Sequence, residues 1–367
     1  MQAPDAPVLL APDFKEKIWG RKDLDPLYPS EELGGGRSPD PDAASAAGGS
    51  ESTIPRIGEA WLTGDNATFL SGSVAGMTLG EVLQQWPKEL CGPNWSGRQF
   101  PVLAKFLFTS DWLSMQVHPD DDDAAAHEQS RGKTEAWYFI ECDPDAELAL
   151  ALPPGATRQA LEAACREARS RDLANRFGPK REEAVFVPAG TLHALGPGLV
   201  LFEVSETSDI TYRLDDYARL DSRGRPRPLH LKRGLETTRL EAPAFRDLPK
   251  VEFSEPFGRR RWAVACRYFA VEQLSVRKPH TFEPALDRVE CLTVISGQGR
   301  VEIKAGWLAY RPGQTWVVPP GSAPYRLMPE KTSSFLRFYV PDLDRDFRRP
   351  LAERGVTAEM ISRIVFD

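Results

Sequence analysis

The chain has 367 residues, of which 41% are hydrophobic and 27% charged, and its formal net charge is −7. This composition is that of an ordinary globular protein, and the length allows two or three domains. The acidic balance argues against nucleic acid or an anionic membrane as the main partner, although a local basic pocket would still accept a small anionic substrate.

The cysteines and the N-terminal segment bear on the compartment. The five cysteines are scattered without a CxxC spacing, and their odd number argues against a complete disulfide framework. The opening residues MQAPDAPVLLAPDF lack the basic and apolar regions of a signal peptide. No run approaches the ~18 apolar residues that a transmembrane helix needs. We therefore expect a cytoplasmic protein without a membrane partner.

The first third of the chain contains one low-complexity stretch and one helix. Residues 34–52, rich in glycine, alanine and serine, are expected to form a surface insertion. A helix is predicted to begin after Thr78, which is a suitable N-cap, and to end before Pro87.

Short alternating or β-branched runs, interrupted by many prolines and glycines, make up most of the remaining chain. This pattern predicts a mainly β sandwich or barrel. A helix is expected over 156–177, opening with Thr157, and another over 357–366. Residues 222–250 are predicted to be a linker, and a second β-rich block follows over about 251–342.

The stretch LSMQVHP has an unusual alternation. As a strand it places Ser114, Gln116 and His118 on one face, while its other face is apolar (Leu113, Met115, Val117). We expect the apolar face to pack outward under covering structure and the polar face to point into a cavity.

The second β-rich block looks like a degenerate copy of the first. VPAGTLH (187–193) matches VPPGSAP (318–324), TEAWYFI (134–140) matches VECLTVI (289–295), and LSMQVHP (113–119) weakly matches LSVRKPH (274–280). These alignments set Glu290 opposite Glu135, but they replace both histidines of the first copy with proline. We therefore expect the second copy to keep the fold without a metal site.

Four side chains from three expected neighbouring strands could form one mixed nitrogen and oxygen site. Gln116, His118, Glu135 and His193 would suit zinc or another divalent transition metal, with one position open to water or substrate. The ordinary alternative is that a histidine is merely structural, and we expect the remaining three, His127, His230 and His280, to be structural or on the surface. Residues 120–123, all aspartate, are expected to form a solvated turn or a helix N-terminus.

These motifs resemble a known family. FPVLAKFLFTSDWLSMQVHPDD, GKTEAWYFI, VPAGTLHAL, SDITYRLDDY, KIWGRKDL and IGEAWLTG are similar, in the same order, to segments of the type I phosphomannose isomerases, zinc enzymes of the cupin superfamily. The resemblance implies two tandem cupin (jelly-roll β-barrel) domains with a small helical insertion. The catalytic domain would span 1–240 and the degenerate one 241–367, as in the short bacterial form.

The same resemblance implies roles for individual residues. The zinc ligands, one ion per chain, would be Gln116, His118, Glu135 and His193. Further implied residues are the active-site arginine Arg213, an acid/base Lys133, Asp209 for ring opening, Lys105 and Ser114 for the phosphate, and Trp19 and Glu59 in the cleft. Gly132 departs from longer members, which carry a histidine there.

The implied reaction interconverts mannose 6-phosphate and fructose 6-phosphate through a cis-enediol. The sequence leaves the base open: Lys133 would need a lowered pKa, and it would otherwise serve as a phosphate-binding cation, with metal-bound hydroxide as a third option. Rival readings are an iron-dependent cupin dioxygenase, a non-catalytic sugar-phosphate-binding cupin, and an isomerase of another aldose phosphate or a free aldose. Oligomeric state is left open.

Overall fold

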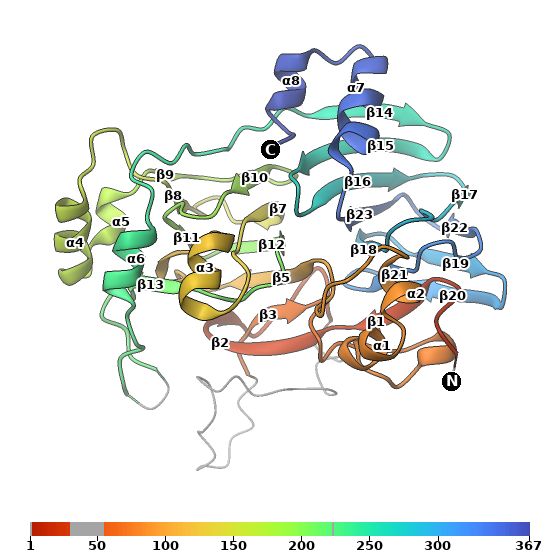
Figure 1. Cartoon of the computed structure of the whole chain (residues 1–367), viewed down its shortest axis with the longest axis horizontal. Helices are drawn as coiled ribbons and strands as arrows, with labels where there is room; N and C mark the ends of the chain where they lie inside the picture. Colours follow the sequence, from red (N-terminus) through yellow and green to blue (C-terminus); the bar gives the residue numbers. More distant parts are fainter. Residues whose placement is uncertain (1, 30–54, 222–223) are drawn as a thin grey trace.

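The computed structural model describes residues 2–29, 55–221 and 224–367, so the whole of the predicted surface insertion, 34–52, lies outside the described residues. The chain is mainly β, and four sheets pair to form two sandwiches (Figure 1). Within the described residues, no helix combines the length and the apolar character needed to cross a membrane.

The first sandwich is built from a six-stranded and a five-stranded sheet. The six-stranded sheet has the order β10 (Ala184–Val187), β7 (Glu135–Cys142), β12 (Leu199–Ser205), β5 (Leu103–Thr109), β3 (Ile57–Trp61) and β2 (Asp13–Arg21). The five-stranded sheet has the order β13 (Tyr212–Asp215), β6 (Met115–Val117), β11 (His193–Leu195), β8 (Leu148–Leu150) and β9 (Arg176–Phe177). Apolar residues of both sheets, such as Leu107, Trp137 and Leu150, fill the space between them.

The second sandwich is built from an eight-stranded and a four-stranded sheet. The eight-stranded sheet has the order β14 (Val251–Glu255), β15 (Gly258–Ala265), β16 (Ala270–Val276), β23 (Ser333–Tyr339), β18 (Glu290–Ser296), β21 (Thr315–Val318), β1 (Val8–Ala11) and β4 (Thr68–Phe69). The four-stranded sheet has the order β17 (His280–Phe282), β22 (Tyr325–Pro329), β19 (Gly299–Ile303) and β20 (Gly306–Tyr310). The outer faces of the two large sheets share a core in which Phe202 and Phe338 lie 5.2 Å apart.

Strand order repeats between the sandwiches. The order β10-β7-β12-β5-β3-β2 corresponds to β21-β18-β23-β16-β15-β14, and Glu135 pairs with Val187 as Glu290 pairs with Val318. Two of the three predicted internal matches therefore hold in register. The third is wrong, because Leu274–Val276 belongs to β16, in the place of β5, whereas β17 takes the place of β6.

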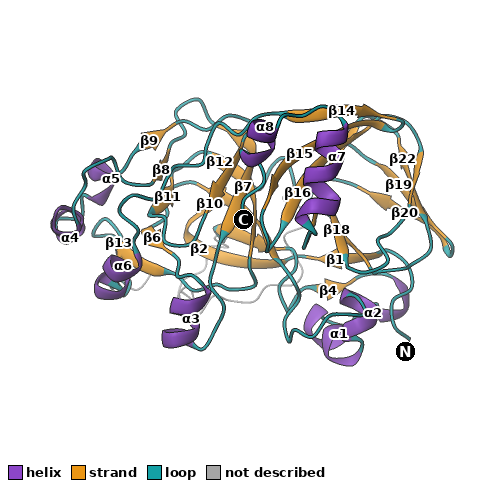
Figure 2. Ribbon diagram, turned by 45° about the horizontal axis from the view of Figure 1, so that its top comes forward, coloured by secondary structure: helices purple, strands orange, loops and turns teal. Residues whose placement is uncertain are grey.

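The helices lie on the outside of the two sandwiches (Figure 2). They are η2 (Gly72–Val74), α1 (Leu79–Gln85), α2 (Pro87–Cys91), α3 (Asp121–Glu128), α4 (Arg158–Arg166), α5 (Ser170–Leu173), α6 (Leu231–Thr237), η3 (Asp344–Arg348), α7 (Arg349–Glu353) and α8 (Ala358–Ser362). Helix α1 has the predicted boundaries, since Thr78 and Glu81 form a capping box and Trp86 ends it before Pro87. The aspartates of 120–123 form the N-terminus of α3, with Asp120 as its N-cap.

The long helix predicted over 156–177 is wrong in its second half. It begins after Thr157 as expected, but Ala168 adopts a left-handed conformation (φ 55°) and ends the first helix. Asp215 then holds both the backbone N–H and the hydroxyl of Ser170, at 3.1 and 2.6 Å, which fixes α5 against the five-stranded sheet. The last residues of the predicted helix form β9, which pairs with β8.

The predicted linker 222–250 also contains structure that the sequence did not indicate. Helix α6 buries Leu235 in the apolar layer on the outer face of the five-stranded sheet, and its Gly234 packs closely against Leu214. The same layer holds Met115 and Val117, as expected, whereas Leu113 lies in the inner core of the first sandwich, contrary to prediction.

Candidate active site and metal centre

Three strands of the first sandwich bring His118, Glu135 and His193 together. His193 begins β11 and pairs with Gln116 of β6, Glu135 begins β7, and His118 directly follows β6. One ligand atom from each of the three side chains lies within 4.8 Å of the others. All three side chains are buried, so the cluster has the spacing and the donor types of a metal site.

The backbone orients both imidazoles. The Nδ1 of His118 donates to the carbonyl of Ile210 at 2.7 Å, and the Nδ1 of His193 donates to the carbonyl of Thr191 at 2.9 Å. The Nε2 of each ring therefore keeps its lone pair and faces the cluster. Burial lowers the pKa of both histidines, reinforced at His118 by the nearby Lys133, so both rings are neutral at neutral pH.

Glu135 supplies the charge of the cluster. Its carboxylate oxygens lie 3.5 Å from Nε2 of His118 and 3.4 Å from Nε2 of His193. Burial would raise its pKa, but the Lys133 ammonium 2.7 Å away and the two imidazoles together outweigh burial and lower the pKa to about 2. The indole N–H of Trp137 donates to the same carboxylate at 3.1 Å, so Glu135 is held as an anion.

Gln116 lies beside the cluster with its amide nitrogen 3.2 Å from Nε2 of His193. Its amide oxygen accepts from the hydroxyl of Ser114 at 3.2 Å. As a metal ligand the amide would have to present its oxygen, which requires the amide to turn over.

The cluster adjoins a cavity of about 380 Å³. Eight predicted site residues line this cavity, here called the cleft: Trp19, Glu59, Lys105, Ser114, Gln116, Lys133, Asp209 and Arg213. Asp209, Thr211 and Arg213 all reach it, as their alternation predicted. The structure thus brings the predicted residues into one place, which the sequence spacing alone could not show.

Two buried lysines line the cleft, and one of them, Lys133, also contacts Glu135 of the metal-site cluster. Lys133 lies 3.1 Å from Glu203, and Lys105 lies 2.6 Å from Asp209 and 4.0 Å from both Glu203 and Glu59. Burial would lower the pKa of Lys133, but the surrounding carboxylates, led by Glu135, raise it above its usual value. Burial and the charge of Glu135 raise the pKa of Glu203 to about 7, against the opposing effect of the lysines.

Sequence reasoning missed several cleft residues, of which Glu203 is the most central. The alternation of LVLFEVS places Glu203 on the inner face with Leu199 and Leu201, so a lone carboxylate in an apolar strand was an available signal. Lys17 and Arg227 also line the cleft. His230, predicted to be structural or on the surface, lines it too, and its Nδ1 accepts the backbone N–H of Arg213 at 3.2 Å.

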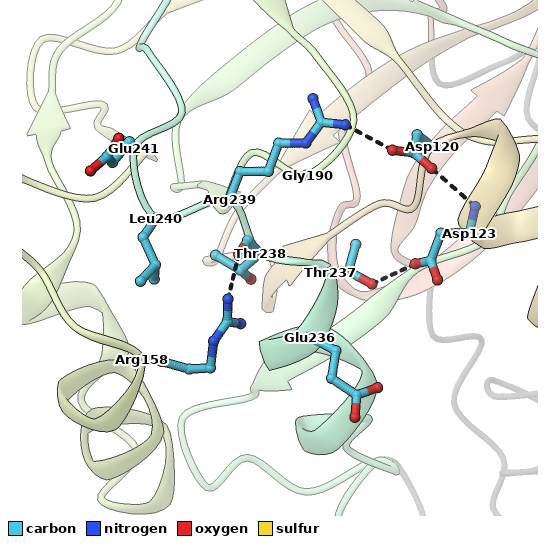
Figure 3. A pocket seen from close by; sticks show the side chains of 10 residues that line it. All are labelled: Asp120, Asp123, Arg158, Gly190, Glu236, Thr237, Thr238, Arg239, Leu240 and Glu241. Carbon is cyan, nitrogen blue, oxygen red and sulfur yellow. Dashed lines mark hydrogen bonds and ion pairs between the residues drawn. The ribbon is translucent and has the colours of Figure 1, made fainter.

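A larger cavity of about 640 Å³ lies behind the turn that precedes His193 (Figure 3). The two arginines that line it contact neighbouring groups: Arg239 forms an ion pair with Asp120 at 2.7 Å, and Arg158 donates to the carbonyl of Thr238 at 3.4 Å. Thr237 donates to Asp123 at 2.7 Å (Figure 3). This cavity contains none of the predicted site residues, so the smaller cleft is the candidate active site.

Fold and site together define a class: a mainly β protein with a buried His-Glu-His centre that opens onto a charged cleft. Residues 41–161 match the family model described as the catalytic domain of type I phosphomannose isomerase. The chain is 30% identical over 329 residues to the mannose-6-phosphate isomerase ManA of Bacillus subtilis, covering 88% of this chain and 95% of that protein. It is 32% identical over 306 residues to "Probable mannose-6-phosphate isomerase GmuF" of the same organism, covering 80% and 87%.

Solved structures agree with these relatives. The crystal structure of the mannose 6-phosphate isomerase from Bacillus subtilis superimposes with a TM-score of 0.77 at 27% identity, covering 91% of this chain and 99% of that one. This chain therefore belongs to the type I phosphomannose isomerase family.

Proposed function

We propose that this chain is a zinc-dependent aldose–ketose isomerase that interconverts mannose 6-phosphate and fructose 6-phosphate through a cis-enediol. The observation that carries the proposal is the position of Lys133. Its ammonium group forms ion pairs both with Glu135 of the proposed metal site and with Glu203 of the cleft. The named relatives support the substrate, since ManA is called a mannose-6-phosphate isomerase and GmuF a probable one.

The donor set fits one zinc ion per chain. Two neutral imidazoles with free Nε2 atoms, one carboxylate and the neighbouring amide of Gln116 are nitrogen and oxygen donors of the kind that zinc accepts. A bound divalent cation would polarise the sugar oxygens and, by taking up the charge of Glu135, would lower the pKa of Lys133.

Lys133 and Glu203 are the proposed proton carriers. They lie 3.1 Å apart at the inner end of the cleft, so one proton can be held by either side chain while substrate is bound. Both are buried, which excludes bulk water from the transferred proton. Glu135 serves as a ligand and is therefore a poor base.

The remaining predicted residues receive positioning and binding roles. Arg213 is proposed to stabilise the negative charge that develops on the enediol. Asp209 is proposed to assist ring opening, and its ion pair with Lys105 gives Lys105 the role of orienting it. Because three carboxylates surround Lys105, we assign the phosphate contact to Ser114 rather than to Lys105, and we place Trp19 and Glu59 against the sugar.

We also infer the domain plan implied by the resemblance: two tandem cupin barrels, 1–240 and 241–367. The repeated strand order and the matched pairing of Glu135 and Glu290 support it, with β1 and β4 of the first segment completing the eight-stranded sheet of the second barrel. A reducing cytoplasm is supported by the five cysteines, all of which are free thiols.

A coupled assay tests the activity. Mannose 6-phosphate is supplied and fructose 6-phosphate is detected before chelation, after chelation, and after zinc is returned. We expect turnover to be lost with the metal and restored by zinc. A folded, zinc-loaded protein that turns over another aldose phosphate but not this one would overturn the substrate assignment. Binding of the sugar phosphate without turnover would favour the non-catalytic alternative.

A further inference from the structure

Two carboxyl groups hold the backbone on both sides of Lys133. The N–H of Gly132 donates to Asp121 at 2.9 Å, and the N–H of Thr134 donates to Glu206 at 2.9 Å. The N–H of Lys133 itself donates to the carbonyl of Pro119 at 2.9 Å. Three consecutive backbone amides are therefore fixed just before the ligand Glu135, although neither carboxyl group lines the cleft.

The packing leaves this segment little freedom. A Cβ atom at Gly132 would lie 2.5 Å from the carbonyl carbon of Asp120 and 2.6 Å from the nitrogen of Asp121. Glycine is therefore required where the segment crosses the N-terminus of α3. The other side of that N-terminus is tied down by the ion pair of Asp120 with Arg239 (Figure 3).

Glu206 is buried, and its carboxyl group forms a hydrogen bond with the carboxyl group of Asp121. Burial and the proximity of Asp121 raise the pKa of Glu206 to about 7, against the effect of the Thr134 N–H, while Arg131 pairs with Glu206 at 3.4 Å. One proton shared between the two carboxyl groups satisfies both of them.

Tyr268 links this pair to the second sandwich. It lies in the turn between β15 and β16, and its hydroxyl donates to the second oxygen of Asp121 at 2.8 Å. Arg267 donates to the same hydroxyl, and the Arg131 guanidinium lies 5.8 Å from the Tyr268 ring.

We propose that Asp121 and Glu206, anchored by Tyr268 of the second sandwich, are positioning residues that set the segment carrying Lys133 and Glu135. This inference rests on the proposed function for its kinetic effect, but its effect on metal binding does not depend on the substrate. The second half of the chain thereby contributes to the site without touching it.

Zinc affinity, measured by competition with a chelator, tests the proposal together with kcat and KM for mannose 6-phosphate. We expect Glu206→Ala to weaken zinc binding about 10-fold and to lower kcat by a similar factor, because outer groups that orient ligands have effects of that size. KM should change much less. Glu206→Gln should stay within about twofold of the wild type in both quantities, since its amide can still accept from Thr134 and donate to Asp121.

Tyr268→Phe removes only the hydroxyl that donates to Asp121. This variant tests the proposal even if Glu206→Ala does not fold. We expect a weakening of zinc binding of about threefold. Tyr310→Phe is the matched control, because it removes one buried hydroxyl that donates to Ser333 at 2.9 Å within the second sandwich. It should lower the melting temperature without changing zinc affinity.

The outcomes separate the two proposals. Unchanged zinc affinity in both Glu206→Ala and Tyr268→Phe, with only a lower melting temperature, would overturn the positioning role. A wild-type protein that binds zinc but does not turn over mannose 6-phosphate would overturn the proposed function, while the zinc affinities of the variants would still decide the positioning role.

Discussion

The two large sheets carry buried charged clusters at corresponding positions, but three of the four corresponding charges are reversed in sign. Four residues lie side by side on consecutive strands of the first sheet, in the order Trp61, Lys105, Glu203 and Trp137. The corresponding positions of the second sheet hold Trp262, Glu272, Arg337 and Leu292. By the same registers Glu59 corresponds to Arg260, and Lys133, two residues before Glu135, corresponds to Arg288, two residues before Glu290.

The second cluster is internally neutralised. Glu272 is fully buried and pairs with Arg260 and Arg337, each at 2.7 Å, while the hydroxyl of Tyr339 donates to it at 2.6 Å. Arg337 also lies 3.7 Å from Glu290. Arginine, which stays cationic, occupies the place where the first sheet has the titratable Glu203. One cluster can therefore exchange protons, whereas the other can serve only as a fixed ion network.

The strongest test of this contrast removes a histidine from each sandwich. His118→Ala is expected to reduce bound zinc to below about 0.1 per chain and turnover by at least about 10³-fold, because it removes one of the only two imidazole ligands of the proposed site. Elemental analysis and the coupled assay measure both effects.

His280→Ala is the matched control, since His280 begins β17, which takes the place of β6. It should keep zinc and activity at wild-type levels. If zinc were retained in His118→Ala but lost in His280→Ala, the metal site would lie in the second sandwich and the proposed site would be wrong.

A second pair compares the two cations beside the corresponding glutamates. Lys133→Met is expected to lower kcat by about 10²- to 10³-fold, with a smaller change in KM, because it removes a proton carrier. Arg288→Met should leave kcat unchanged at temperatures where it is folded. Equal losses of kcat in the two variants would mean that Lys133 acts only through stability.

The third test concerns Glu272 and stability. Burial would raise its pKa, but Arg337 and Arg260 outweigh burial and lower it to about 2. Glu272→Gln should cost about 3 kcal/mol of unfolding free energy at pH 7 without changing zinc content, because two buried cations lose their anion.

The lowered pKa of Glu272 also determines the pH range over which this residue stabilises the fold. Since the folded pKa lies below the normal value of 4.5, the stabilisation is complete above pH 4.5 and is lost as the pH falls toward 2. Denaturant unfolding of wild type and Glu272→Gln should therefore converge below pH 4.5. A difference that grows on acidification would contradict the ion network.

The smallest expected effect is the stabilisation of the apo protein by zinc. At a free zinc concentration of 100 times Kd we expect a gain of about 2.7 kcal/mol, because only the folded chain forms the site. Glu290→Gln should keep this gain and His118→Ala should lose it, as measured by thermal unfolding. A gain that survives in His118→Ala would point to zinc binding elsewhere.

Much of the first sandwich could be predicted because its motifs are local. The alternation around Gln116 and His118, and the cap at Thr78, each depend on a few neighbouring residues, and their spacing survives in the structure. The internal matches at Glu290 and 318–324 succeeded for the same reason.

What failed depends on contacts distant in sequence. The helix predicted over 156–177 is interrupted where the backbone N–H and the hydroxyl of Ser170 donate to Asp215, 45 residues away in the sequence. His230 reaches the cleft through its contact with Arg213, which no spacing indicates. The sign reversal of the second cluster was equally hidden, because it appears only when the registers of six strand pairs are known.

The pairing of β1 with β21 has a consequence for the order in which the chain can fold during synthesis. Val8 lies opposite Val317, and β4 extends the same sheet beyond β1. The first strand to leave the ribosome must therefore wait for about 300 further residues, or roughly 15–60 s at common elongation rates, before its partner β21 exists. Until then β1 can pair only with β4, on its other side, and a fragment cut near residue 240 would leave the β21 side of that strand permanently unpaired.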